Sequence, residues 1–588
     1  MRSRDPWLIF VGFAALYGAM AATTAQGGDA SEFMTVAATF GTPHPPGYPL
    51  FAALTWLSVH LLPFGGVAWK ASIVASLQAA GALAVLFVAL REWTARVPAL
   101  LAVGALGTSL HFWRYATVAE VFAGGALTAA LLLLVCVKIA RGWSGPRAAL
   151  GLGLALSTGI ANHHTVVLLF PLGLFALIGL LPRDAAGRLR SLVAGALALI
   201  PGFAAYLLFL IPAGAWRWGD IHDLGGVLHH FLRRDYGTFK LGLYEGDVSR
   251  WDHPLYWLGQ LTHEFVGLYV VLALVGLVAL RRLRGRDRWL GVATAASLLV
   301  AGPIFLTAFN LPPRGSYLVI ATRFHILPNL LLAPFIALGA QTLLQRTRSR
   351  WAAPALFAGL LVAVGLHGPN AGHRGWTVLE DYLSNLYATV EPNAVVIGSG
   401  DPAVFGSLYL QHAQGLRPDV VYVEPTMAGH PWYVDGLKAQ HPGFRWDNTV
   451  PRDAVLEIID QNLDDRPVYI MFKHARSAHY EGRLPPGYPV GAVLMKIAGP
   501  DEALPPPADV ERELRAAMER HTIRSRVDTL YRAKSTWEYN DYDQYAFAFD
   551  TLAKAYERTG DLHSAVRNRE TAAELSPYRF GDLAHLRR

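Results

Sequence analysis

Two carboxylates and a histidine lie close together near the start of the chain. Asp29 and Glu32 are three residues apart, and the run His44-Pro45-Pro46-Gly47-Tyr48-Pro49 follows them. Acids at positions i and i+3 share one face of a helix, and prolines fix the backbone after His44. A carboxylate held in this way can take a proton from a hydroxyl group. We therefore predict catalytic roles for Asp29 and Glu32 and substrate-binding roles for His44 and Tyr48.

The same spacing also fits a structural interpretation. An Asp at the N-cap of a helix with a Glu at the third helical position is a capping arrangement. The position of the pair favours chemistry, because Asp29 and Glu32 directly follow an apolar segment. A carboxylate near a membrane can be tuned by the loss of solvent. Both interpretations stay open at this point.

Other polar residues stand at the ends of later apolar segments. Arginine suits a phosphate group because its planar guanidinium makes paired hydrogen bonds, and an ionisable side chain at a membrane span is a functional candidate. We predict substrate or donor contacts from Arg114, Glu120, Asn162, His163 and Arg323. The structural alternatives are an ion pair between Glu120 and Arg114, interfacial placement of the histidine, and snorkelling of Arg323. No metal site is assigned to His163 and His164, since adjacent histidines in a regular element rarely point at one ion.

Long apolar runs must hold these residues. Of the 588 residues, 53% are hydrophobic and only 16% are charged, whereas about a quarter are charged in soluble proteins. The composition predicts a polytopic α-helical membrane protein. We expect eleven spans, at Trp7–Thr24, Ala68–Leu90, Ala99–Phe112, Val118–Ala140, Ala148–Ile160, Val166–Leu181, Leu192–Ile211, Phe265–Leu280, Leu290–Ala308, Ile326–Leu344 and Trp351–Leu366.

Basic clusters between the spans predict the orientation. They occur at Arg2/Arg4, Arg91/Arg96, Lys138/Arg141/Arg147, Arg183/Arg188/Arg190, Arg281–Arg288 and Arg346/Arg348/Arg350. All six fall on one side if the apolar stretch Leu50–Leu62 lies along the membrane or dips into it without crossing. The positive-inside rule makes that side cytoplasmic. The N-terminus is then inside, and the C-terminal domain is extracytoplasmic.

The composition changes after Leu366. The segments Val395–Asp401, Val420–Val423 and Pro467–Phe472 resemble buried strands that end in turns. Gly398-Ser399-Gly400-Asp401 lacks the lysine and full glycine spacing of a phosphate-binding loop, so a strand-ending turn is the preferred interpretation. We expect a transmembrane domain at residues 1–368, an extracytoplasmic α/β domain at 369–504 and a helical tail at 505–588.

The tail has the spacing of one tetratricopeptide (TPR) unit. The pattern consists of Phe549, Leu552, Ala553, Tyr556, Gly560, Ala565, Ala572 and Pro577, and Arg569 departs from the aromatic residue expected there. One such unit cannot bury its own apolar face, so we expect it to pack on a neighbouring helix at Asp509–Arg520. A protein contact through the tail and an ordinary helical hairpin are both open interpretations.

The order of these motifs resembles a known family. Gly-Asp-x-x-Glu-Phe at Gly28–Phe33, His44–Leu50, Ala119-Glu120-Val121 and Asn162-His163 occur as in GT-C membrane glycosyltransferases. The resemblance is to the protein O-mannosyltransferase-like family that includes the eukaryotic transmembrane enzyme acting on plexin-type receptors. Many members have Asp-Ser-Gly-Glu where this chain has Asp29-Ala30-Ser31-Glu32. The acids are kept, while the two residues between them differ.

The resemblance implies an inverting glycosyltransferase. It implies a polyprenyl-phosphate sugar as donor, with mannose as the candidate, and a protein serine or threonine or a glycan as acceptor on the extracytoplasmic face. Asp29 matches the acidic residue of the first outer loop, which in the family acts as the catalytic base or orients the acceptor. No cofactor is expected with certainty, and no residue pattern supports a divalent metal. We expect the lipid bilayer of a bacterial inner membrane as the location and no contact with nucleic acid.

Two other functions remain compatible with the sequence. A transporter or flippase of lipid-linked sugars would need paired repeats or broken helices near the middle of the membrane, and no convincing repeat is present. A scaffold anchored by its spans would not need eleven of them. Transfer by an acid-bearing site is therefore the preferred hypothesis.

Overall fold

The computed structural model describes residues 4–580 except 212–213, 215, 239–240, 242–243, 245, 348, 526–536 and 538. Its residues divide into two compact units. Unit 1 comprises Met1–Thr23, Val36–Arg217 and Ile221–Arg374, and unit 2 comprises Thr24–Thr35, Trp218–Asp220 and Gly375–Arg588. The segment with Asp29 and Glu32 thus groups with the C-terminal part of the chain.

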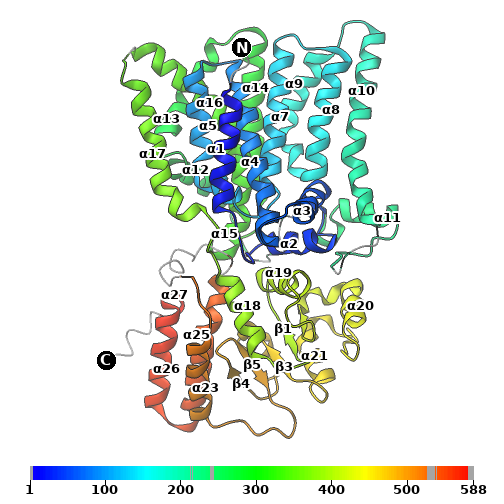
Figure 1. Ribbon diagram of the computed structural model, residues 1–588, viewed down its shortest axis with the longest axis vertical. Helices are drawn as coiled ribbons and strands as arrows, with labels where there is room; N and C mark the ends of the chain where they lie inside the picture. Colours follow the sequence, from blue (N-terminus) through cyan, green and yellow to red (C-terminus); the bar gives the residue numbers. More distant parts are fainter. Residues whose placement is uncertain are drawn as a thin grey trace. The chain divides into compact units, whose positions relative to one another are not determined.

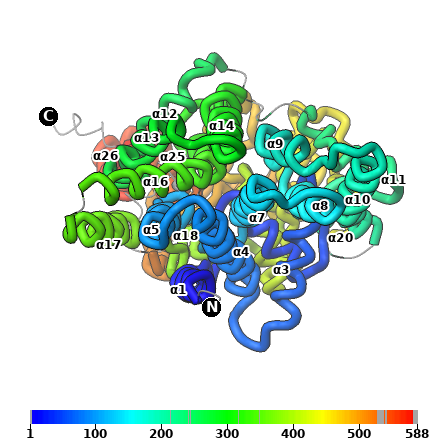
Figure 2. Tube along the Cα trace, turned by 90° about the horizontal axis from the view of Figure 1, so that it is seen from above, coloured from blue at the N-terminus to red at the C-terminus, as the bar shows by residue number. Residues whose placement is uncertain are grey.

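Unit 1 is a bundle of apolar helices (Figure 1). Its longer helices are α1 (Asp5–Met20), α4 (Val67–Arg91), α5 (Arg96–Gly107), α7 (Phe122–Ala140), α8 (Gly145–Asn162), α9 (Phe170–Leu180), α10 (Ala185–Ala204), α13 (Leu268–Ala279), α14 (Gly285–Leu299), α16 (Ile326–Thr347) and α17 (Ala352–Ala371). Each of the eleven predicted spans corresponds to one of these helices. Figure 2 shows α7, α8 and α10 following one another in a row, and α8 packs on both neighbours.

Five helices of the described chain are long and apolar enough to cross a membrane. They are Val67–Arg91, Phe122–Ala140, Ala185–Leu210, Tyr317–Thr347 and Ala352–Ala371. The pair Asp252–Glu264 and Leu268–Arg282, bent by 112°, adds a sixth if it forms one span. The protein is therefore an integral membrane protein, while the number of eleven spans stays a prediction.

Charged residues join several helix ends at one end of the bundle. Arg96 pairs with Asp5 at 2.7 Å, which brings the start of α1 to the start of α5. Arg141, after α7, pairs with Asp287 of α14 at 2.7 Å, and Trp93 donates to the same carboxylate at 3.1 Å. Four of the predicted basic clusters therefore lie together. Asp5 and Arg96 lie at the same end of the bundle, as expected if Leu50–Leu62 does not cross.

The stretch Leu50–Leu62 forms helix α3 (Pro49–Leu61), which packs against α4 and α8. It begins after Tyr48, which has a left-handed backbone at φ 51°. Between α10 and α13 the chain forms two further helices that the sequence did not predict, α11 (Leu224–Phe231) and α12 (Asp252–Glu264). Short helices α6 (Leu110–Tyr115) and α15 (Gly315–Thr322) complete the parts of the bundle that bear on the site.

Unit 2 contains a five-stranded sheet in the order β2-β1-β3-β5-β4. Strands β1 (Val395–Ile397), β2 (Val421–Val423) and β3 (Val468–Ile470) are parallel and fully buried, which confirms the three predicted strands. Strands β4 (Gly487–Val490) and β5 (Leu494–Ile497) are antiparallel additions. Gly398–Gly400 is a turn that leads from β1 into α19 (Asp401–Leu408).

Helices cover this sheet and extend beyond it. The remaining longer helices are α18 (Val378–Thr389), α20 (Pro431–Gln440), α21 (Ala454–Asn462), α23 (Pro507–Arg520), α25 (Tyr539–Thr559) and α26 (Leu562–Leu575). Helices α25 and α26 form the predicted hairpin, and α23 packs on α25 as expected. The assignment of this hairpin as a TPR unit stays a prediction, as does the domain boundary near residue 505.

One carboxylate connects the three tail helices. Glu511 of α23 accepts hydrogen bonds from Arg567 of α26 at 2.8 Å and from the hydroxyl of Tyr556 of α25 at 2.7 Å. Arg515 donates to it at 3.0 Å. Burial alone raises the pKa of Glu511, but these hydrogen bonds lower it overall to about 2. The ionised carboxylate thus holds the hairpin against α23.

We expect Glu511→Gln to destabilise unit 2 by about 1–3 kcal/mol, because hydrogen bonds to a charged group are lost. The exposed Glu519→Gln serves as control and should leave the melting temperature unchanged. The pKa of Glu511 is lower in the folded protein than in the unfolded chain. The stabilisation by its carboxylate is therefore complete above the ordinary pKa of a glutamate, and it is lost as the pH falls towards about 2. The difference in melting temperature between wild type and Glu511→Gln should therefore shrink between pH 5 and pH 3. A constant difference would contradict this role.

Candidate functional site

The two predicted catalytic acids lie at the start of helix α2 (Ala30–Thr39) in unit 2. Asp29 directly precedes the helix, its carbonyl accepts a hydrogen bond from the amide of Phe33 at 3.0 Å, and Glu32 is the third helical residue. These are the N-cap and N3 positions of the capping interpretation. Glu32 is fully buried, whereas Asp29 is half-buried. Asp29 is therefore the more accessible of the two acids.

The other predicted residues belong to unit 1, and most of them lie close together. Arg323 is in a short 3₁₀ segment, Arg323–His325, between α15 and α16. Its guanidinium pairs with Glu120 at 3.4 Å, and the two side chains are only 12% and 4% exposed. The guanidinium also lies over the ring of Phe122, 5.4 Å from the ring centre. The pair of Glu120 and Arg323 joins residues 203 positions apart. From the sequence alone, Arg114 is the expected partner of Glu120.

His163 adds an aromatic wall beside Arg323. Its ring contacts Phe122 and Phe324, with centroids 5.4 Å and 6.0 Å apart. Burial lowers the pKa of His163 well below its usual value, and nearby cationic groups act in the same direction. The ring is therefore neutral, and Nδ1 accepts a hydrogen bond from the amide of Thr165 at 3.1 Å. This leaves the proton on Nε2, so that His163 can donate one hydrogen bond.

The proline-rich turn reaches the same aromatic group. The ring of Tyr48 stacks on His163, with centroids 5.5 Å apart, and its hydroxyl lies 3.0 Å from Nε2 of His44. His230 of α11 donates from Nε2 to the carbonyl of Pro43 at 3.1 Å. Burial lowers the pKa of His230 to about 3, so this ring is neutral as well. The turn is thus anchored to α11 and presents His44 and Tyr48 to His163.

A pocket opens between these side chains. We call it the Arg323 pocket; it is lined by Val121, Phe122, Gly125, Ala126, His163, Thr165, Leu168, Phe305, Arg323, Phe324, Ile326 and Leu327. One cation stands among aliphatic and aromatic walls, which is the character expected of a site for an anionic head group with an apolar chain. Phe122 begins α7, whose 19 residues place the pocket about 28 Å from Arg141 and the basic clusters.

Asn162 and Arg114 lie near the pocket without lining it. The amide of Asn162 donates to the carbonyl of Val121 at 2.9 Å, which fixes the start of α7 to the end of α8. Arg114 is half-buried in α6. The structure therefore brings His44, Tyr48, Glu120, His163 and Arg323 together in unit 1. Among the residues it describes, no group of three His, Cys, Asp or Glu side chains is placed to hold a metal ion.

Several known proteins are similar to this chain in sequence. Residues 29–180 match the family described as the protein O-mannosyl-transferase TMEM260 N-terminal domain. The chain is 28% identical over 472 residues to the protein O-mannosyl-transferase TMEM260 of Mus musculus, covering 76% of this chain and 66% of that protein. It is 26% identical over 525 residues to the Dictyostelium discoideum protein of the same name, covering 79% and 63%. The chain thus spans slightly less than two thirds of these relatives.

Solved structures share the fold. ArnT from Cupriavidus metallidurans bound to undecaprenyl phosphate superimposes with a TM-score of 0.50 at 13% identity, covering 83% of this chain and 96% of ArnT. ArnT in the apo state gives 0.51 at 12% identity, covering 82% and 96%. At such identities the likeness concerns the fold alone.

The contact between α7 and α8 gives a test of the site's geometry. A Cβ atom on Gly124 would overlap the side chain of Asn162, whereas one on the adjacent Gly125 meets nothing within 4 Å. We expect Gly124→Ala to destabilise the bundle by about 1–3 kcal/mol through overpacking, with a lower melting temperature in detergent. Gly125→Ala is the matched control and should melt like wild type. Equal melting temperatures for both variants would show that Asn162 can move away.

Proposed function

Because this chain belongs to a GT-C, protein O-mannosyltransferase-like family, we propose that it is a membrane glycosyltransferase. It transfers a sugar, with mannose as the candidate, from a polyprenyl phosphate to a serine or threonine hydroxyl of a protein on the extracytoplasmic face. The observation that carries the proposal is a mostly buried Arg323 in an apolar pocket, within a chain whose family match begins at Asp29. The relatives named above are eukaryotic, so a bacterial inner membrane is part of the proposal only.

The donor is assigned from the chemistry of the Arg323 pocket. A polyprenyl phosphate has an anionic head and a long apolar tail, and the pocket offers one guanidinium among aromatic and aliphatic side chains. ArnT, which shares the fold, has been solved with undecaprenyl phosphate bound; this support is an analogy at the level of the fold. We assign the phosphate to Arg323, and polar contacts with the sugar or phosphate to His163, Tyr48 and His44.

The transfer needs a base and a stabilised leaving group. The bond between the sugar's anomeric carbon and the phosphate oxygen breaks, and a bond from that carbon to the acceptor oxygen forms. The hydroxyl proton passes to the carboxylate of Asp29, and polyprenyl phosphate leaves with the bonding electrons. A single displacement of this kind inverts the anomeric centre. Glu32 is buried at the third position of α2 and is proposed to support the Asp29 loop; Arg323 stabilises the departing phosphate.

The role of Asp29 is tested by Asp29→Asn, which keeps the shape of the side chain and removes the base. We expect transfer to fall by about 100-fold or more, the usual range for a general base. Mass spectrometry of glycoproteins from cells that carry wild type, Asp29→Asn or no copy of the protein measures the outcome. Asp247→Asn, at an exposed loop position, is the control and should retain all glycosites. Wild-type glycosylation by Asp29→Asn would exclude Asp29 as the base.

The role of Arg323 is tested by Arg323→Lys, which keeps the charge facing Glu120 and removes the planar fork. We expect the KM for polyprenyl-phosphate mannose to rise about 10-fold in purified protein, since one charge-assisted hydrogen bond to phosphate is lost. The exposed Arg314→Lys is the control and should keep the wild-type KM. An unchanged KM for Arg323→Lys would place the donor phosphate elsewhere.

A further inference from the structure

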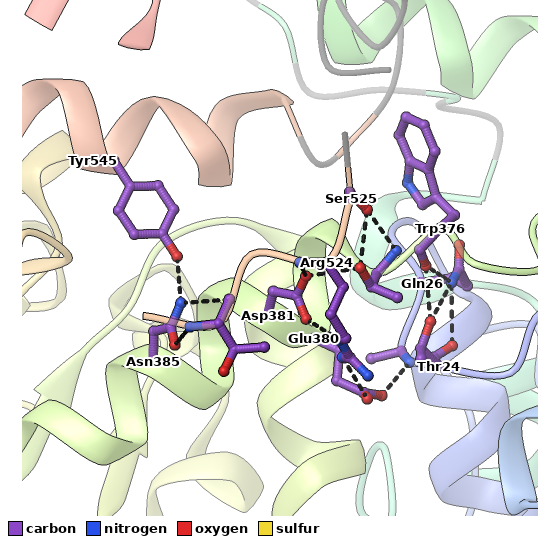
Figure 3. A network of polar contacts seen from close by, with 12 residues as sticks. Thr24, Gln26, Trp376, Glu380, Asp381, Asn385, Arg524, Ser525 and Tyr545 are labelled. Carbon is purple, nitrogen blue, oxygen red and sulfur yellow. Dashed lines mark hydrogen bonds and ion pairs between the residues drawn. The ribbon is translucent and has the colours of Figure 1, made fainter. Parts of the chain in front are cut away.

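The loop that carries Asp29 is fastened to the C-terminal part of the chain. Figure 3 shows the contacts, all of which lie within unit 2. The amide of Ala25 donates to Oε2 of Glu380 in α18 at 2.9 Å. The hydroxyl of Thr24 and the side-chain amide of Gln26 both donate to the carbonyl of Trp376 at 2.8 Å. Three consecutive residues before the acid-bearing loop are therefore held by α18 and the residues that lead into it.

The loop is also closed on itself. The amide of Gln26 donates to Oγ of Ser31 at 2.9 Å, and that hydroxyl donates back to the carbonyl of Gln26 at 2.6 Å. Both residues are buried. Only four residues, Gly27 to Ala30, lie between them, and Asp29 is one of these. The position of Asp29 follows from that of Gln26, which in turn depends on Trp376 and Glu380.

Glu380 is itself held in place by an arginine far along the chain. Arg524 donates from Nη2 to Glu380 at 3.1 Å and from Nε to the neighbouring Asp381 at 2.6 Å. The backbone amide of Arg524 donates to the second oxygen of Asp381 at 2.7 Å. One guanidinium thus bridges two adjacent carboxylates at the start of α18 (Figure 3), which fixes the rotamer of Glu380.

A second contact from the tail reaches the turn beside Asp29. Gly28 has φ +68°, and a Cβ atom there would lie 2.8 Å from Nε1 of Trp537. A residue with a side chain would be strained in this backbone conformation and would also meet the indole. The loop therefore packs directly on Trp537, and this contact is independent of the hydrogen bonds to α18.

We propose that Glu380 and Arg524 are positioning residues for the acid at position 29, and that the C-terminal part of the chain is a component of the transfer machinery. This inference rests on the proposed function, in which Asp29 is the base. A segment of four residues that leads into a helix has many conformations, and fixing the base in one of them lowers the barrier to proton transfer. The hydrogen bond from the amide of Ala25 to Glu380 supplies part of that restraint. The bridge from Arg524 to Glu380 and Asp381 supplies the rest.

The test uses the full-length protein, polyprenyl-phosphate mannose and a serine- or threonine-containing peptide from a glycosite found by mass spectrometry. We expect Glu380→Ala and Arg524→Gln to lower kcat about 10-fold or more, with the KM for donor within about 2-fold of wild type, because the base is displaced while the Arg323 pocket is untouched. Glu380→Gln retains an acceptor for the amide of Ala25 and should recover most of kcat. Arg520→Gln, four residues from Arg524 and exposed, is the control.

A double-mutant cycle separates positioning from general destabilisation. In Asp29→Glu the carboxylate is already displaced by one methylene group, so adding Glu380→Ala should lower kcat by much less than it does in wild type. Full additivity, or a wild-type kcat for both Glu380→Ala and Arg524→Gln, would overturn the proposal. These outcomes differ from failure of the proposed function, in which Asp29→Asn itself retains transfer.

Discussion

The ion pair between Arg323 and Glu120 joins two distant segments of the membrane bundle at the candidate site. A charge in apolar surroundings is costly unless it is paired, and here the partners come from the start of α7 and from the break between α15 and α16. The pair fixes two distant parts of the chain against each other. Replacing a buried ion pair with apolar side chains is often neutral or stabilising. The proposed binding of the donor phosphate therefore explains this pair better than a contribution to stability does. A guanidinium carries five N–H donors, so pairing with a carboxylate is compatible with binding a phosphate.

At Asp29 and Glu32 the capping interpretation and the proposed catalytic role are compatible. Asp29 and Glu32 occupy the positions that a capping arrangement requires. The position that starts α2 is therefore also the position of the proposed base, and one local pattern serves both interpretations.

The sequence predicted what local patterns determine. Apolar runs located a helix at each expected span, and Val-rich segments located β1, β2 and β3. It missed β4 and β5, because Pro489 and Lys496 interrupt their patterns, and it missed α12. The partner of Glu120 and the grouping of Thr24–Thr35 with unit 2 had no local signal, since each depends on contacts hundreds of residues apart. The roles of the site residues remain predictions that the experiments above address.

The anchoring of the acid-bearing loop changes how the C-terminal part is understood. Ordering one residue of a flexible loop costs about 1–2 kcal/mol of conformational entropy. Hydrogen bonds from Ala25 and Gln26 to α18, together with the Gly28–Trp537 contact, offset that cost before any substrate binds. A region that served only to recruit acceptors would not need these contacts. Their presence in unit 2 connects the stability of the C-terminal fold to the geometry of the proposed base, so substitutions that loosen α18 or the segment at Arg524 should act on the chemical step.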